Sequence, residues 1–201
     1  MKDLLRKTLN LNKDKYIDRL LKLVEKDTHI LGHGIDGGFE ANGQEYLIEV
    51  FNQLNADEII RDQLSEEVIQ KSINLYKEGN PGHNYDNRYN VYATFKGEGG
   101  KSIMFNGHVD NMPVDNENNW SSPPLKPVVR DGKLYGAGIC DMKSGLMAAI
   151  MAVELLKDAN IKLPGDVKIV SVVDEEGGGN GSITAALNGQ RADGVVVCEP
   201  T

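Results

Sequence analysis

The feature that most constrains the fold of this chain is a series of short apolar runs in its second half. Apolar residues dominate positions 103–105, 166–173 and 194–198. Such runs are typical of strands that are buried on both faces. Between the first two, segment 143–157 is rich in alanine, leucine and methionine and predicts a well-buried helix. The alternation of strand and helix therefore predicts an α/β fold whose sheet is covered by helices on both faces.

Side chains that can bind metals or transfer protons lie where these predicted elements begin or end. They are His108, Asp110, Asp141, Glu175, Glu176 and Glu199. His108 and Asp110 are two residues apart on an extended segment, so both should point to the same side, although this pair alone also fits a structural histidine. Ligands bind at the carboxyl ends of strands in open α/β sheets. One imidazole and five carboxylates would repel one another there unless a cation held them.

The residue types also indicate which cation fits. Mixed nitrogen and oxygen ligands suit zinc, with manganese or cobalt as alternatives. The sequence therefore predicts a metal site at this edge of the sheet.

Local patterns predict further elements. Asn12 is expected to cap an amphipathic helix, and a second helix is expected around residues 46–54. Segment 59–79 is interpreted as a strand followed by a short helix. Segments 90–95 and 102–105, separated by a glycine-rich stretch, have the spacing of a hairpin. Residues 128–135 carry Asp-Gly between two short apolar runs, which is a strong hairpin signal.

Other residues that could carry chemistry have simpler interpretations. His29 and His33 have the spacing of a helical zinc pair, but the surrounding glycines disfavour a helix. His83 is interpreted as a solvated loop histidine. The glycine-rich loop 177–181 lacks the last glycine of a dinucleotide fingerprint and the Lys-Ser/Thr of a P-loop, so nucleotide binding is not expected.

Composition excludes some classes of protein. The 201 residues carry a formal net charge of -8, which argues against a nucleic-acid partner. No run approaches the ~18 apolar residues of a membrane span, so no membrane partner is expected. Two cysteines are too few for a disulfide framework and suit a reducing compartment, so a cytoplasmic location is expected.

Five motifs, in this order, resemble those of the M20 metallopeptidases. They lie at residues 107–110, 131–136, 140–145, 174–176 and 198–201. The family includes acetylornithine deacetylase, succinyl-diaminopimelate desuccinylase, aminoacylase and the glutamate carboxypeptidases. The resemblance covers residues 85–201 well, and it implies a three-layer αβα domain with a mixed, mostly parallel central sheet.

The resemblance also implies a metal arrangement. Two zinc ions would be bridged by Asp141, with His108 and Glu199 on one ion and Glu176 on the other; cobalt or manganese are alternatives. It further implies a cis peptide bond between Asp141 and Met142.

The resemblance implies two catalytic residues as well. Glu175 would be the general base, and the carboxylate of Asp110 would orient His108.

The resemblance implies a larger protein. Residues 1–201 would form the N-terminal part of the catalytic domain, and the lid or dimerisation domain and the C-terminal catalytic segment, with the last histidine ligand, would be absent. The expected activity of the full-length homodimeric parent is removal of an acyl group from an N-acyl amino acid, closest to acetylornithine deacetylase. The alternatives are a dipeptidase or carboxypeptidase of the same family, and an inactive metal- or peptide-binding fragment.

Overall fold

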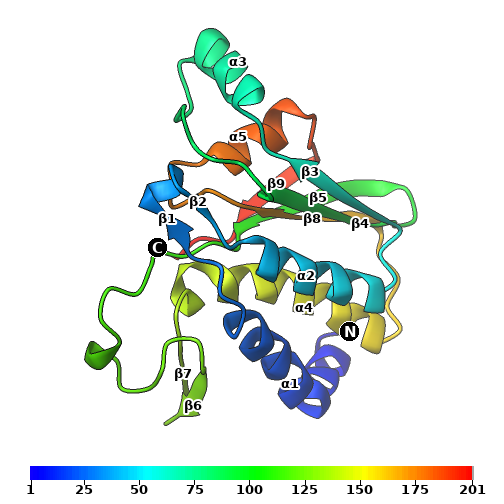
Figure 1. The fold of residues 1–201 in the computed structure, drawn as a ribbon. Coiled ribbons are helices and arrows are strands. Elements are labelled where there is room, and N and C mark those ends of the chain that lie inside the picture. Colours follow the sequence, from blue (N-terminus) through cyan, green and yellow to red (C-terminus); the bar gives the residue numbers. More distant parts are fainter. Residues whose placement is uncertain (201) are drawn as a thin grey trace.

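The computed structural model describes residues 1–200, in which a central sheet is sandwiched between helices (Figure 1). Thr201, the last residue of the 198–201 motif, lies outside the described residues. The sheet has the strand order β3-β4-β8-β5-β9. Its strands are β3 (Glu58–Gln63), β4 (Tyr89–Phe95), β5 (Gly100–His108), β8 (Gly165–Val172) and β9 (Gly194–Val197).

Within the described residues, four of the five strands of this sheet run in the same direction. Strand β5 runs parallel to both β8 and β9, whereas β4 runs antiparallel to both β3 and β8. The expected α/β class with a mixed, mostly parallel central sheet is confirmed. Strand β4 alone runs against the other four, which makes the sheet mixed.

Helices cover both faces of the sheet, which confirms the three-layer arrangement (Figure 1). Helices α1 (Lys2–Val24), α2 (Ala41–Gln53) and α4 (Ser144–Asp158) lie on one face. The shorter helices α3 (Glu66–Tyr76) and α5 (Asn180–Leu187) lie on the other. Every helix within residues 1–200 is too short or too polar to cross a membrane.

The main core lies between the sheet and helices α2 and α4. Helix α2 buries Leu47 and also Val50 and Phe51, which follow Leu47 by three and four residues and so lie on the same helix face. Helix α4 contributes Leu146 and Ile150 to the same core. This packing holds the start of α4 against the carboxyl ends of the strands.

The outlying elements are short. Strands β1 (Ile30–Leu31) and β2 (Gly37–Gly38) pair around a turn at Gly32–Gly34. Strands β6 (Val128–Arg130) and β7 (Lys133–Tyr135) form the expected hairpin. Its turn residues, Asp131 and Gly132, have φ of 51° and 72°, as a type I′ turn requires.

Three sequence-based expectations are wrong. Strands β4 and β5 do not form a hairpin, because β8 lies between them and pairs with both. Asn12 does not cap a helix, because α1 already begins at Lys2 and the Asn12 amide donates to the Thr8 carbonyl within it. Strand β9 is not buried, because it lies at the edge of the sheet as described, and all of its residues are exposed.

Candidate metal centre

His108 stands at the carboxyl end of β5 and is fully buried. Its Nδ1 lies 2.9 Å from the carbonyl oxygen of Asp110, and its Nε2 faces a group of carboxylates. The distances from Nε2 are 3.0 Å to Asp141 Oδ1, 3.5 Å to Glu199 Oε1 and 3.8 Å to Glu175 Oε2. One ring nitrogen is therefore held by the backbone, and the other is directed at oxygen atoms that could share a cation.

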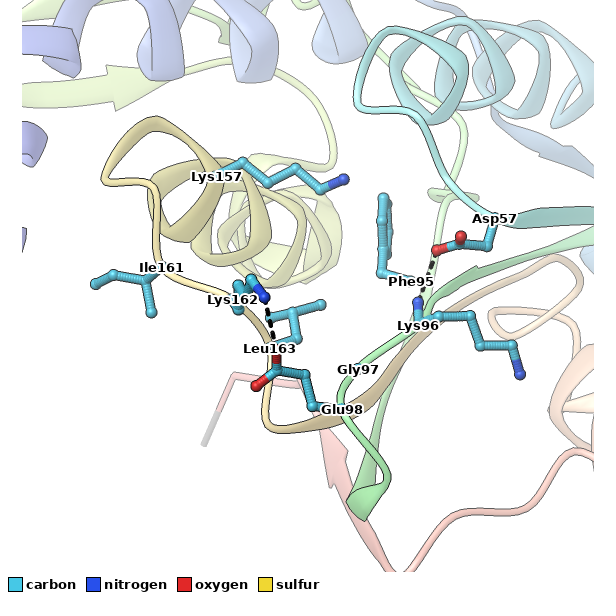
Figure 2. Close-up of a pocket in the computed structure, with 9 residues that line it drawn as sticks. All are labelled: Asp57, Phe95, Lys96, Gly97, Glu98, Lys157, Ile161, Lys162 and Leu163. Atoms are coloured by element: carbon cyan, nitrogen blue, oxygen red, sulfur yellow. Dashed lines mark hydrogen bonds and ion pairs between the residues drawn. The ribbon is translucent and has the colours of Figure 1, made fainter.

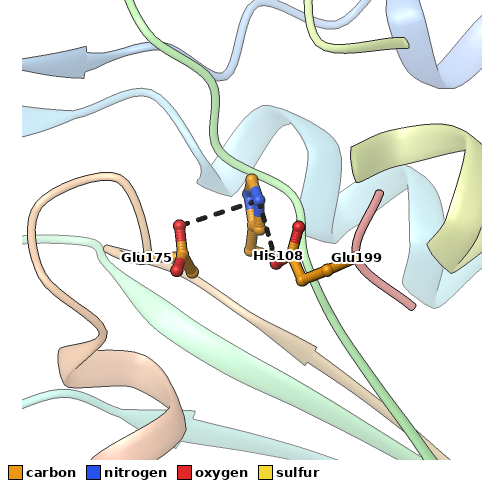
Figure 3. A group of neighbouring side chains, drawn as sticks. All are labelled: His108, Glu175 and Glu199. Carbon is orange, nitrogen blue, oxygen red and sulfur yellow. Dashed lines mark ion pairs between the residues drawn. The ribbon is translucent and has the colours of Figure 1, made fainter. Parts of the chain in front are cut away.

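Two overlapping groups of side chains could hold a metal ion. One is His108, Glu175 and Glu199, drawn in Figure 3, where the two carboxylates approach the imidazole from different elements. The other is His108, Asp141 and Glu176. Within each group the ligand atoms all lie within 4.8 Å of one another. Because Nε2 has a single lone pair and Nδ1 is engaged, these groups are parts of one cluster rather than two separate sites.

The structure thus brings together all four of the predicted metal ligands, His108, Asp141, Glu176 and Glu199. Glu175, the predicted general base, lies in the same cluster. The donor set is one imidazole nitrogen and several carboxylate oxygens, which fits zinc and similar divalent ions. The carboxylates are partly open to solvent, with 56% of the Asp141 side chain and 41% of the Glu175 side chain exposed. A cation and a small substrate could therefore reach the cluster.

Asp110 contacts the cluster differently from the expectation. Its carboxylate Oδ1 lies 3.6 Å from His108 Nδ1, farther than its own carbonyl oxygen. Its Oδ2 accepts a hydrogen bond of 2.9 Å from the backbone N–H of Glu176. Asp110 therefore joins the end of β5 to the loop that follows β8, while its Oδ1 is buried without a hydrogen-bond partner in residues 1–200.

The segment before α4 places Asp141 opposite His108. The peptide bond between Asp141 and Met142 is cis, as the resemblance implies. The Met142 sulfur accepts a contact of 3.1 Å from the backbone N–H of His108. A Cβ at Gly107 would lie 2.7 Å from the end of the Met142 side chain, so a glycine before His108 lets the two segments approach.

The charges of the cluster shift its protonation. Burial alone would lower the pKa of His108, but the carboxylates of Asp110, Asp141 and Glu175 raise it to about 10. Burial is the largest cause that raises the pKa values of Glu175, Glu176 and Glu199, and the neighbouring carboxylates add to it while His108 opposes it. Without a cation, this edge holds several carboxylates in mutual repulsion, which a bound divalent ion would relieve.

A cavity of about 340 Å³ opens beside the cluster. Its lining includes Asp141 and Glu176 together with the apolar side chains of Met112, Pro113 and Trp120. A substrate group of modest size could lie there, next to the carboxylates.

A second cavity, of about 350 Å³, lies near the start of β8, at the opposite end of that strand from His108 (Figure 2). Its lysines are already paired: Lys162 contacts Glu98 at 2.9 Å, Lys96 contacts Asp166 at 3.1 Å, and Lys157 donates to a backbone carbonyl at 2.7 Å. This cavity therefore offers no free cation for an anionic ligand.

Sequence reasoning missed buried polar groups around the site. Arg88 and Lys143 are fully buried, and neither was distinguishable from a surface cation by its neighbours in the sequence. His83 is not a solvated loop residue: its side chain is only 6% exposed and bonds to Asp174. His29 pairs with a nearby aspartate and is in none of the metal-capable groups found in the described part of the chain.

An αβα sandwich with a histidine and carboxylates gathered at the carboxyl ends of its strands is an arrangement typical of α/β metallohydrolases. A comparison of the sequence with known protein families identifies a family within this class. Residues 104–201, just under half of the chain, match the family described as Peptidase family M20/M25/M40, and this part of the chain is that of an M20 family peptidase.

Curated relatives share part of this sequence. The chain is 40% identical over 118 residues to the N-formyl-4-amino-5-aminomethyl-2-methylpyrimidine deformylase of Halalkalibacterium halodurans, a match that covers 57% of this chain and 28% of that protein. It is 38% identical over 104 residues to the succinyl-diaminopimelate desuccinylase of Dechloromonas aromatica, covering 49% of this chain and 28% of that protein. The matched stretch thus spans well under half of either relative.

Solved structures share the fold. Human carnosine dipeptidase 1 superimposes with a TM-score of 0.75 at 18% identity, covering 98% of this chain and 41% of that one. The M20 family metallo-carboxypeptidase of Sulfolobus solfataricus superimposes with a TM-score of 0.68 at 22% identity, covering 90% of this chain and 36% of that one. At these identities the likeness concerns the fold alone.

Proposed function

We propose that the protein is a metal-dependent amidohydrolase that removes the acyl group from an N-acyl amino acid or a closely related small amide. The observation that supports this most is the cluster around His108 Nε2, where carboxylates from three separate segments converge within 4 Å. Such a cluster is costly unless a cation is bound, and it lies beside a cavity that could take a small substrate.

The proposed centre holds two zinc ions, with cobalt or manganese as alternatives. His108 and Glu199 would bind one ion, Glu176 the other, and Asp141 would lie between them. When bound, the ions supply Lewis acidity and favour ionisation of a nearby water. Asp141 Oδ1 lies 3.0 Å from His108 Nε2, and Asp141 also shares a metal-capable group with Glu176, which supports this arrangement.

Glu175 is the proposed general base. Its carboxylate reaches the same space as the ligands but lies farthest of the measured carboxylates from His108 Nε2, at 3.8 Å. A carboxylate free of metal could accept a proton from the attacking water and deliver it to the nitrogen that leaves. Asp110 would act indirectly, by holding the backbone of Glu176 and the orientation of His108.

The choice of a deacylase over a peptidase draws on the curated relatives. Their names describe removal of a formyl or a succinyl group. The alternatives are a dipeptidase or carboxypeptidase on the same scaffold, and a metal- or peptide-binding protein without activity. The activity is proposed for the protein as a whole, because the matched stretch covers 28% of those relatives; a lid domain, a C-terminal catalytic segment and a homodimer remain predictions.

Matched variants test the assignment. Glu175→Gln should lower kcat on N-formyl, N-acetyl or N-succinyl amino acids at least about 100-fold while the metal content, measured by plasma emission spectrometry, is retained. Glu176→Gln should lower metal content itself. Near-full activity of Glu175→Gln would contradict its role as base, and loss of metal from that variant would make it a ligand. Dipeptides cleaved faster than N-acyl amino acids would favour the peptidase alternative.

A further inference from the structure

A buried polar network adjoins the segment that carries Glu175 and Glu176. It is built around Asp174, the residue directly before the Glu175–Glu176 pair. Asp174 and Arg88 are fully buried, as is Glu40. None of the three belongs to the metal-capable groups in residues 1–200. We propose that Arg88, His83 and Asn180 form a socket for the Asp174 carboxylate, and that this socket positions Glu175 and Glu176 for metal binding and catalysis.

Arg88 anchors the socket. Its Nε and Nη2 donate to the Glu40 carboxylate at 2.5–3.1 Å, and its Nη2 also donates to Asp174 Oδ1 at 2.7 Å. Its Nη1 donates to the carbonyl oxygens of Gly34 and Asn84, each at 3.1 Å. Every N–H of the guanidinium thus has a partner, and the planar fork fixes where the Asp174 carboxylate can lie.

The second oxygen of Asp174 is held from the other side. Oδ2 accepts from His83 Nδ1 at 2.8 Å and from the Asn180 side chain at 2.9 Å. Asn180 is itself fixed, because it also donates to the Tyr85 hydroxyl at 2.8 Å. The carboxylate is therefore held at both oxygens by groups from two separate segments of the chain, residues 83–88 and the start of α5.

Two glycine-rich loops leave room for this carboxylate. A Cβ at Gly34 would lie 2.3 Å from Asp174 Oδ1, and a Cβ at Gly177 would lie 2.4 Å from the same atom. Gly34 also has a φ of +90°, which other residues rarely adopt. These glycines belong to loops that neither metal binding nor nucleotide binding accounts for, and close packing around Asp174 explains them.

The socket acts on the site through the backbone. Asp174 has a φ of 60°, in the left-handed region that is unfavourable for residues other than glycine. Its carbonyl accepts from the Gly179 N–H at 3.0 Å, which closes the turn that carries Glu175 and Glu176. At the far side of the turn, Asp110 accepts from the Glu176 N–H. Hydrogen bonds thus hold both Asp174 and the backbone N–H of Glu176. The turn cannot rotate, and the side chains of Glu175 and Glu176 stay directed at the cluster.

This positioning role rests on the proposed function. The test therefore measures metal binding rather than the rate of hydrolysis. Asp174→Asn keeps the shape of the side chain but removes the negative charge that pairs with Arg88 and His83. We expect its affinity for Co²⁺, measured by titration of the visible absorption of the bound ion, to fall about 10- to 100-fold, with an altered spectrum at saturation. His83→Ala removes one contact only and should show a smaller loss in the same direction.

A control separates positioning from stability. Glu154→Gln breaks a buried ion pair with Arg19 between α1 and α4, away from the Asp174 turn. It should lower the stability of the fold but leave the Co²⁺ affinity and spectrum unchanged. If Asp174→Asn fails to fold, the comparison is made with His83→Ala.

The outcomes are distinguishable. If the unaltered protein binds no Co²⁺, the proposed function fails. If it binds Co²⁺ and the Asp174→Asn or His83→Ala variant that folds binds it with the same affinity and spectrum, the socket has only a structural role and the inference fails alone.

Discussion

Replacing Gly145 with alanine tests how closely helix α4 and the segment that carries Glu199 depend on each other. Gly145 is the second residue of α4, where alanine would ordinarily stabilise the helix by about 1 kcal/mol. A Cβ at this position, however, would lie 2.1 Å from the carbonyl oxygen of Cys198. That atom belongs to the backbone directly before Glu199, so it cannot swing aside as a side chain could.

The size of the effect follows from this distance. Ordinary contact begins at 3.4 Å, so α4 and the Cys198 carbonyl must separate by roughly 1.3 Å. Overpacking of this kind costs about 1–3 kcal/mol, which should outweigh the gain in helix propensity. A ligand that moves by about 1 Å also exceeds the roughly 0.2 Å tolerance of a metal site, so Zn²⁺ affinity should fall at least about tenfold.

The assay combines urea unfolding with calorimetric Zn²⁺ titration. Gly194→Ala is the matched control, because Gly194 lies on the neighbouring strand β9 and a Cβ there meets nothing within 4 Å. The control should retain both stability and affinity. A Gly145→Ala variant that is more stable than the parent and binds Zn²⁺ equally well would refute the reasoning.

Further predictions concern the core and its ion pairs. Leu47→Ala should cost about 3–5 kcal/mol in urea unfolding, because the side chain is fully buried in the main core; a cost below 1 kcal/mol would contradict this packing. Glu154→Gln should lower the stability by about 1–3 kcal/mol, since it removes the charge that faces Arg19 at 2.7 Å and Lys15 at 3.1 Å while Gln53 still accepts from Arg19, and Arg19→Met in the same background should recover part of the loss. Burial raises the pKa of Asp158, but hydrogen bonds, chiefly from Lys15, lower it below its ordinary value. Its contribution is therefore present above about pH 4 and is lost as the pH falls further, so Asp158→Asn should be less stable by under about 1 kcal/mol at pH 7 and equal to the parent near pH 2. A difference that persists at pH 2 would argue against the ionic contribution.

The candidate site was largely predictable because its residues follow local patterns. Each of Asp141, Glu175, Glu176 and Glu199 lies where a helix begins or an apolar run ends, and the carboxyl ends of neighbouring strands meet at one edge. The atom of Asp110 that contacts His108 could not be predicted from local patterns in the sequence. Whether its carbonyl or its carboxylate lies nearer to His108 depends on a backbone turn that spacing does not specify.

The sequence by itself determined the α/β class, most of the helices, the hairpin at 128–135 and the residues that gather at the candidate metal centre. These depend on periodicity and turn chemistry within a few residues. Only the tertiary structure decided that β8 enters between β4 and β5, that β9 lies at an exposed edge, and that Arg88 is buried against Asp174. Such features arise from contacts between residues far apart in the chain, since a strand can pair with any compatible edge and a charge can be buried wherever a partner from another segment satisfies it.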